Sequence, residues 1–233
     1  MRVLNDTNPR AAAKIMHYLS KALESTGLKA SNTSAQIING EEEGMLGWIT
    51  ANYLRNSFAT AKTSQNGSKP LLGALDWGGA SSQITFITNS SNASRNVRLF
   101  GKEHKLYTAS HICYGQAEAL KRYFVQLIYE SFRANGKFMI KLSAPCQPRD
   151  GKQSFKIADL FDGPCTTYKD VKFREAVKSL KNDTVFVFKG SSDHDACRSD
   201  IKVQFDAQKC KETYEEEHCL EAKDIPMPAH DTS

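Results

Sequence analysis

This chain of 233 residues has six cysteines, all from residue 113 on, and no two of them form a CxxC pair. Structural zinc sites usually draw their ligands from such close pairs, so the spacing argues against zinc although His111, His194 and His218 each lie near a cysteine. An even number of cysteines instead favours disulfides and an oxidising environment, without deciding which cysteines pair. The six are Cys113, Cys146, Cys165, Cys197, Cys210 and Cys219.

Six N-x-S/T sequons point to the same secretory environment, although each such match is common by chance. They begin at Asn5, Asn32, Asn66, Asn89, Asn92 and Asn182. The opening residues MRVLNDTNPR lack the apolar stretch of a signal peptide, and no apolar run reaches the roughly 18 residues that a membrane helix needs. A secretory domain without a signal peptide predicts that the chain lacks its natural N-terminus.

Composition and charge are those of a globular domain. Apolar residues make up 40% of the chain and charged residues 24%, so it is neither fibrous nor disordered by composition. The formal net charge of +5 comes from lysines and arginines that are interleaved with acids. This pattern gives little support for nucleic acid binding and mildly favours an anionic ligand.

The first third of the chain predicts a helix, a strand and a second helix. Residues 9–27 open with proline, carry Ile15, Leu19 and Leu23 one turn apart and end in glycine. The apolar run AQIING at 35–40 predicts a short buried strand. Helical spacing from Met45 on predicts the second helix, with Trp48 and Tyr53 in the core and the three glutamates of GEEEG in the turn before it.

The middle of the chain predicts strands followed by a long helix. After a polar loop at 59–70, the segment at 71–88 predicts two strands joined by a glycine turn, and the segment at 96–110 predicts a hairpin through Gly101. Residues 116–132 predict a helix of about four turns. Its apolar face would carry Ala117, Leu120, Phe124, Leu127 and Ile128. Beyond it we expect loop-rich, cysteine-bearing stretches, one strand at 184–190 and a polar tail.

Two short stretches could carry chemistry. In ALDWGGASS, Asp76 at the end of a buried strand could bind a hydrated metal ion, while backbone amides of the glycine turn, with donors from Ser81, Ser82 and Gln83, could bind phosphate. The alternative is a tight hairpin in which Asp76 only caps the turn. From these residues alone both remain open.

In GEEEG, acids at a helix N-terminus are favoured by the helix dipole, each by roughly 0.3 to 1 kcal/mol, so the simplest reading is a helix start. One carboxylate is enough for that purpose, and three between glycines leave room for a second role. A carboxylate held against a water could orient that water, or accept its proton, for attack on phosphorus.

Together, IINGEEEGMLGWITANYL and LDWGGASSQITF resemble the ecto-nucleoside triphosphate diphosphohydrolases, the apyrase family, whose third and fourth conserved regions look like GQEEGxxGWxxxNYL and LDLGGASTQITF. The resemblance continues through RLFGKEHKLYTASHICYG and DLFDGPCTTY, so it covers most of the chain. The opening MRVL resembles the end of the family's second region, ATAGMRLL.

The resemblance implies a role for each matching residue. Glu43 would orient the attacking water, Asp76 would hold Ca²⁺ or Mg²⁺ through coordinated water, and Gln83 would assist near the water. The terminal phosphates would be cradled by Gly78, Gly79, Ala80 and Ser81. Glu41, where the family usually has glutamine, and Glu42 would be support or surface. Gln116 stands where relatives often carry lysine or arginine, which removes the basis for a basic contact there. The implied disulfides are Cys113–Cys165, Cys146–Cys197 and Cys210–Cys219.

The implied fold is α/β, the actin-like (ribonuclease H-like) ATPase architecture with two lobes. Residues 1–40 would be the C-terminal part of the first lobe, and residues 41–233 a second lobe that is truncated at its C-terminal end. The implied reaction is hydrolysis of the terminal phosphate of nucleoside tri- and diphosphates by in-line attack of water. The full protein would be a glycoprotein at the extracellular surface or in the secretory lumen, with a membrane anchor that this chain lacks.

Three family regions are absent or incomplete here, so we expect the chain alone to hydrolyse ATP poorly or not at all. One rival is an exopolyphosphatase-type hydrolase of the same superfamily, against which the GWITANYL segment and the cysteines argue. The other rival is a non-catalytic secreted module that binds nucleotide or partner proteins.

Overall fold

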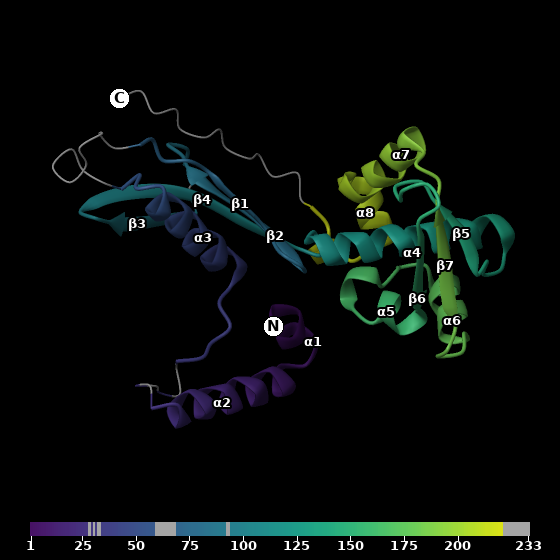
Figure 1. Ribbon diagram of the computed structural model, residues 1–233, viewed down its shortest axis with the longest axis horizontal. Coiled ribbons are helices and arrows are strands. Elements are labelled where there is room, and N and C mark those ends of the chain that lie inside the picture. Colours follow the sequence, from purple (N-terminus) through teal and green to yellow (C-terminus); the bar gives the residue numbers. More distant parts are fainter. Residues whose placement is uncertain (28, 30, 32–33, 59–68, 92–93, 221–233) are drawn as a thin grey trace.

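The computed structural model describes residues 1–27, 29, 31, 34–58, 69–91 and 94–220. Figure 1 shows two groups of elements joined by helix α4 (Gln116–Asn135). One group is a sheet of strand order β1-β2-β4-β3 with helix α3 on one face, and the other is a sheet of order β5-β7-β6 surrounded by helices. Helices α1 (Arg2–Thr7) and α2 (Pro9–Ser25) lie beside the first group.

Helix α2 confirms the helix expected at 9–27. The side chain of Asn8 accepts a hydrogen bond from the amide of Ala11, proline is the first helical residue, and Gly27 has a φ of +78° just beyond the helix. The apolar side chains that predicted an amphipathic helix are nevertheless exposed, as Ile15 and Leu19 show. Of its apolar side chains only Ala12 is fully buried, so most of the expected apolar face lies open among the described residues.

The strand expected at 35–40 does not form. Residues 35–39 have no regular structure, and helix α3 (Gly40–Leu54) begins at the last residue of the run. The sheets formed by the described residues include no strand beside this segment, so its amide and carbonyl groups have no strand to pair with.

Helix α3 starts earlier than expected. The three glutamates lie in its first turn rather than in a turn before it, and Asn39 caps the helix by accepting from the amide of Glu42 at 2.8 Å. Trp48 is fully buried, and its indole nitrogen donates to the carbonyl oxygen of Leu72. Tyr53 is 62% exposed and stacks on Phe100, so its predicted core position is wrong.

The first sheet contains strands β1 (Ala74–Trp77), β2 (Ser81–Ile87), β3 (Arg95–Leu99) and β4 (Lys102–Ile112), all paired antiparallel. This confirms the two strands joined by a glycine turn and the hairpin through Gly101, whose φ is +81°. Strand β1 is an edge strand, and Leu75 and Trp77 on the face away from α3 are 73% and 61% exposed. The expectation that Asp76 ends a buried strand is therefore wrong.

Helix α4 is longer than the four turns expected, and its buried face is rotated. Phe124 and Ile128 are buried as predicted, but Ala117 and Leu120 are exposed. Arg122 is buried instead. It donates to the carbonyl oxygens of Cys165 and His218 and stacks against tyrosine rings, which satisfies most of its guanidinium.

The second half is more regular than the loop-rich region that we expected. Strand β7 (Val185–Gly190) confirms the predicted strand, pairing parallel with β5 (Lys141–Ala144) and antiparallel with β6 (Lys152–Lys156). The remaining elements are α5 (Ile157–Phe161), η1 (Pro164–Thr166), α6 (Val171–Lys178), α7 (His194–Phe205), α8 (Ala207–Thr213) and η2 (Glu216–His218). Most are too short to show a hydrophobic period in the sequence.

Three disulfides cross this half: Cys113–Cys165, Cys146–Cys197 and Cys210–Cys219. These are the pairs that the resemblance implies. Aromatic rings fill the core beneath them, with Phe124 of α4 packed against Phe155 and Phe188. The α/β class, the two sheets and the disulfides agree with the fold that the resemblance implies.

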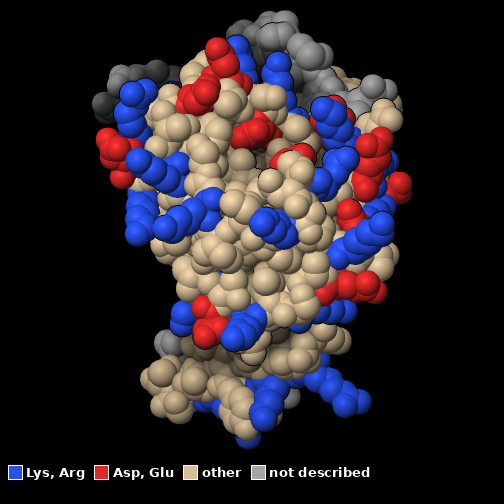
Figure 2. All heavy atoms as spheres, turned by 90° about the vertical axis from the view of Figure 1, so that its right-hand side faces the viewer, with Lys and Arg blue, Asp and Glu red and all other residues tan. Residues whose placement is uncertain are grey.

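Acids and bases are interleaved on the face of the second group that Figure 2 shows, so neither sign of charge dominates that face. Within the described residues, none of the helices has the length and apolarity to cross a membrane. Asn5, Asn89 and Asn182 of the sequons are exposed. The other three sequon asparagines, and most of the loop expected at 59–70, lie outside the described residues.

Replacing Phe124 by alanine should destabilise the protein by about 3–5 kcal/mol, because a fully buried ring that contacts two other rings would leave a cavity. Leu120 lies on the same helix and is 41% exposed, so Leu120→Ala serves as the control and should cost far less. The free energy of unfolding from urea titration measures both. Equal losses in the two variants would contradict the assigned core.

Candidate functional site

One cavity of about 360 Å³ brings together the residues that the sequence singled out. Its lining comes from the first turn of α3, the end of β1, the start of β2, and the N-terminal residues through α2. The predicted residues on it are Glu43, Asp76, Gly78, Gly79, Ala80, Ser81 and Gln83. Ser82 is not part of the lining, because it pairs with Trp77 on the opposite face of the sheet.

Glu43 enters the cavity from the first turn of α3, with its side chain 41% exposed. Its Oε2 atom lies 2.7 Å from Nη2 of Arg2, and the same Nη2 donates to Ser81 Oγ at 2.5 Å. Despite this proximity, Glu43 Oε2 is a buried atom that accepts no hydrogen bond among the described residues. The carboxylate is therefore held by charge while one oxygen can still accept a hydrogen bond.

Gln83 fixes the hydroxyl group of Ser81. It is buried in β2, and its Nε2 donates to Ser81 Oγ at 2.8 Å and to Ser110 Oγ at 2.9 Å. Both donor hydrogens of this amide are thereby used within the protein. Gln83 consequently orients the serine at the floor of the cavity in the structure as it stands.

The turn at residues 78–81, here called the glycine turn, joins β1 to β2. The amide of Gly78 donates to the carbonyl oxygen of Ser81 at 3.0 Å, which closes the turn. Asp76 precedes it on the edge strand, and its side chain shares the α3 face of the sheet with Gln83, the residue it pairs with. Asp76 is exposed, so its carboxylate is open to solvent and to a cation.

Helix α3 reaches this position because Gly44 has no side chain. A Cβ atom there would meet Thr85 Oγ1 at 2.9 Å, Thr108 Oγ1 at 3.0 Å and Gln83 Cβ at 3.1 Å. The two threonine hydroxyls share a hydrogen bond of 2.7 Å, and Thr108 Oγ1 also donates to the carbonyl oxygen of Glu41 at 3.1 Å. This contact sets the first turn of the helix, and with it Glu43, against the sheet.

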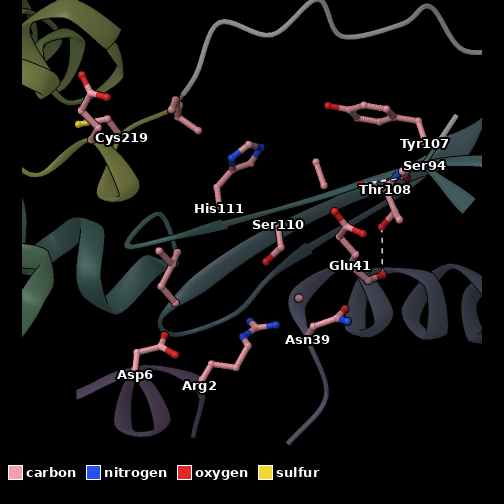
Figure 3. A pocket seen from close by; sticks show the side chains of 15 residues that line it. Arg2, Asp6, Asn39, Glu41, Ser94, Tyr107, Thr108, Ser110, His111 and Cys219 are labelled. Carbon is pink, nitrogen blue, oxygen red and sulfur yellow. Dashed lines mark hydrogen bonds between the residues drawn. The ribbon is translucent and has the colours of Figure 1, made fainter. Parts of the chain in front are cut away.

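A second cavity, of about 820 Å³, lies along strand β4 on the other side of Arg2. Figure 3 shows Arg2 extending from α1, with Asn39 and Glu41 at the start of α3 facing Ser110 and Thr108 of β4. Glu41 lines this cavity and Glu43 lines the first, so the two acids serve different surfaces. The backbone amide of Glu42 is engaged by the cap at Asn39.

Sequence reasoning missed Arg2 and Ser110. Arg2 was read only as part of MRVL, and its ion pair with Glu43 joins residues that are 41 positions apart, a separation that no local pattern reveals. Ser110 lies in a strand whose threonines and serines gave no individual signal. Its partner Gln83 was the only indication of a polar contact here.

The oxygen donors around the cavity fit a hard divalent cation. Asp76 and Glu43 offer carboxylates and Ser81 a hydroxyl group, while histidine and cysteine are absent from the lining. No cluster of three or more His, Cys, Asp or Glu side chains capable of holding a metal occurs in the part of the chain that the structure describes. Mg²⁺ usually binds through one or two carboxylates together with water and substrate phosphates, and Asp76 and Glu43 are the carboxylates on this lining.

Adding a methyl group at Gly44 should push α3 off the sheet and destabilise the protein by about 1–3 kcal/mol, because three atoms lie within 3.1 Å of the new Cβ. The matched control is Gly47→Ala on the same helix, where the new Cβ meets no atom within 4 Å. That control should be neutral or stabilising, since alanine favours helix. Urea unfolding distinguishes them, and similar stabilities would refute the close contact.

Comparison with known proteins gives a consistent result. The family model of the GDA1/CD39 (nucleoside phosphatase) family matches residues 1–231. Ectonucleoside triphosphate diphosphohydrolase 3 of Homo sapiens is 34% identical over 94% of this chain and 40% of its own length. Ectonucleoside triphosphate diphosphohydrolase 8 of Gallus gallus is 38% identical over 71% of this chain and 34% of its own length.

The chain thus spans 34 to 40% of the length of these relatives. Among solved structures, nucleoside triphosphate hydrolases from Neospora caninum match 71% of this chain and 37% of theirs, with 19% identity and a TM-score of 0.46. That likeness is too weak to define the architecture. The match of the family model along almost the whole sequence is decisive: the chain belongs to the GDA1/CD39 family of nucleoside phosphatases.

Proposed function

We propose that this chain carries one half of an apyrase site, which hydrolyses the terminal phosphate of nucleoside tri- and diphosphates by in-line attack of water. The observation that supports this most is the single cavity shared by Glu43, Asp76 and the glycine turn. Family membership supports nucleotides as the substrate class over inorganic polyphosphate. The names of the relatives, which describe triphosphate diphosphohydrolases, agree with both tri- and diphosphates.

Glu43 is the proposed group that orients the water. Its side chain is 41% exposed while Oε2 is buried against Arg2, so a water in the cavity can meet the carboxylate at its exposed part. Arg2 holds the carboxylate by an ion pair, and the same guanidinium nitrogen donates to Ser81, which limits the directions in which Glu43 can turn. A water bound to the exposed part of the carboxylate would then lie in the cavity that the glycine turn also lines.

The glycine turn would bind the terminal phosphates through backbone amides, with the hydroxyl of Ser81 held by Gln83 as a further contact. Asp76 would hold Ca²⁺ or Mg²⁺ through coordinated water. When bound, such an ion supplies positive charge that neutralises the phosphate oxygens. The protein's part is to position these groups, because phosphoryl transfer depends mainly on positioning and electrostatics.

The cellular location of the full protein and its division into two lobes are part of the same proposal. Three disulfides and three exposed sequon asparagines support an extracellular or secretory-lumen setting. A membrane anchor of the full protein and glycosylation belong to this proposal too. Residues 1–40 would be the end of a first lobe and residues 41–233 the second, which agrees with the separate position of α1 and α2 in Figure 1.

The half-site explains why the isolated chain should be a poor enzyme. Asp76 is exposed on an edge strand and the Glu43 side chain is 41% exposed, so both carboxylates remain hydrated. Electrostatic stabilisation of a transition state is strong only where water is excluded. The apyrase half-site and the non-catalytic module would therefore both show little turnover. Binding of a nucleotide with a divalent ion separates the two hypotheses better than the rate of hydrolysis does.

A non-hydrolysable ATP analogue should bind the chain in the presence of Ca²⁺ and lose most of its affinity in EDTA, because Asp76 would hold, through water, an ion whose charge neutralises the phosphate oxygens. Asp76→Asn should reproduce the loss, whereas Asp183→Asn, an exposed position outside the cavity, should bind as the unchanged chain does. Calorimetric titration measures all three. No heat with the unchanged chain, or equal binding by Asp76→Asn, would favour the non-catalytic module.

Phosphate release from ATP by the purified chain should be slow or undetectable, and any release should depend on Ca²⁺ or Mg²⁺. Glu43→Gln should lower a detectable rate by about 10² or more, since it removes a general base. Glu41→Gln, which lines the other cavity, is the control. Rapid turnover that Glu43→Gln abolishes would overturn the prediction of a poor enzyme, and faster release from polyphosphate than from ATP would overturn the substrate class.

A further inference from the structure

All four carbonyl oxygens of the glycine turn accept hydrogen bonds from amide groups of the protein. The bonds are Gln116 N to Gly78 O (2.9 Å), Ala117 N and Glu118 N to Gly79 O (2.9 and 3.2 Å), Cys113 N to Ala80 O (2.8 Å) and Gly78 N to Ser81 O (3.0 Å). Three of these donors are the first amides of helix α4. The free amides of a helix N-terminus usually bind water or an anion, but here they are used on the turn itself.

Two amides of the same turn, in contrast, make no hydrogen bond within the described residues. These are the amides of Gly79 and Ala80, and both residues line the 360 Å³ cavity. A carbonyl oxygen facing an anion would repel it, whereas a free amide attracts it. A turn with every carbonyl engaged and two amides free is therefore suited to bind an anion on one side only.

Gly115 makes this arrangement possible. It is the buried residue before α4, and a Cβ atom there would lie against the amide nitrogen of Ser81 and 2.5 and 2.6 Å from the carbonyl carbons of Gly79 and Ala80. Its φ of −70° is open to any residue. Glycine is thus required for space and not for backbone conformation, because only without a side chain can α4 approach the turn.

We propose that Gly115 and the first turn of α4 are positioning elements for the glycine turn. The first amides of α4 bind carbonyl oxygens of the turn on the side away from the cavity. The amides of Gly79 and Ala80 are then left to face the terminal phosphates of a nucleotide. The identity of that ligand rests on the proposed function, whereas the support of the turn does not. Gly115 touches no substrate and acts only through residues 78–81.

The support is itself anchored in the second half of the chain. Tyr114 is buried, its hydroxyl donates to the carbonyl oxygen of Gln204 in α7 and accepts from the amide of Leu220, and its own carbonyl oxygen accepts from the indole of Trp77. Cys113 is tied to Cys165 by a disulfide. The segment 113–115 therefore joins the glycine turn to the disulfide-bearing part of the protein.

The sharpest test removes the backbone hydrogen bond from Gln116 to Gly78, together with the 3.5 Å bond from the Gln116 side chain to the carbonyl oxygen of Trp77, without disturbing the helix. Gln116 is the first residue of α4, where proline is well tolerated, and Gly115 has the extended conformation (ψ 158°) that proline requires before it. Gln116→Pro deletes the donor to Gly78 and should weaken binding of a non-hydrolysable ATP analogue with Ca²⁺ by about tenfold. Val171→Pro places the same residue at the first position of α6, away from the cavity, and should bind unchanged.

A second pair of variants gives a readout that does not need a nucleotide. In Gly115→Ala, the backbone amide NMR signals of residues 78–81 should shift and the amides of residues 116–118 should exchange faster with solvent, while Gly47→Ala leaves both unchanged. Aromatic side-chain signals of the Phe124 core should stay in place, which separates a displaced turn from a failure to fold.

Unchanged signals at residues 78–81 in a folded Gly115→Ala would overturn the support. Full analogue affinity in Gln116→Pro, measured on a chain that does bind the analogue, would overturn it as well. If the unchanged chain binds no analogue, the proposed function fails for this chain, and the amide signals of Gly115→Ala still decide whether α4 positions the turn.

Discussion

The candidate site depends on two glycines, Gly44 and Gly115, at which a helix packs closely on another element because the glycine itself adds no side chain. At Gly44, helix α3 lies so close to β2 and β4 that an added methyl group would fall within 3.1 Å of three atoms. At Gly115, the start of α4 touches the backbone of the glycine turn. Tightly packed contacts of this kind cannot absorb even one methyl group without moving a whole element. Together they fix the two walls of one cavity, Glu43 on one and residues 78–81 on the other.

The ion pair of Arg2 with Glu43 is of a different kind. It is partly exposed, and pairs of that sort contribute at most about 1 kcal/mol, so it does not hold the fold together. Helix α1 has no buried residue, which leaves the contacts of Arg2 with Glu43 and Ser81 as its firmest attachment to the site. The cavity thus has two kinds of wall. Helix α3 and the glycine turn are held by close glycine contacts, whereas α1 is attached through the charge of Arg2.

How far the sequence predicts this structure depends on the range of the interaction. Local patterns were sufficient for α2, for the strands around the glycine turn, and for the hairpin through Gly101, because caps, glycines and alternation act between neighbours. The disulfide pairs, which the structure shows, and the proposed roles of Glu43 and Asp76 come from the resemblance, since no spacing decides them. Position in space is what the sequence could not supply. AQIING has the composition of a strand but no strand beside it, and Tyr53 has helical spacing but faces solvent.

The least predictable feature is the one that connects the two halves of the molecule. CYGQA reads as an unremarkable start of a helix, yet Cys113, Tyr114 and Gly115 each touch a different structure: a disulfide, helix α7 and the glycine turn. Because the disulfide-bearing half holds this segment in place, its role is not confined to stability. A shift of α4 along its axis would carry the first amides of the helix with it and turn the carbonyl groups of residues 78 and 79 toward the cavity. The Cys113–Cys165 disulfide and the contact of Tyr114 with α7 would in this way act on the side of the turn that we propose binds the anion, although none of these residues lines the 360 Å³ cavity.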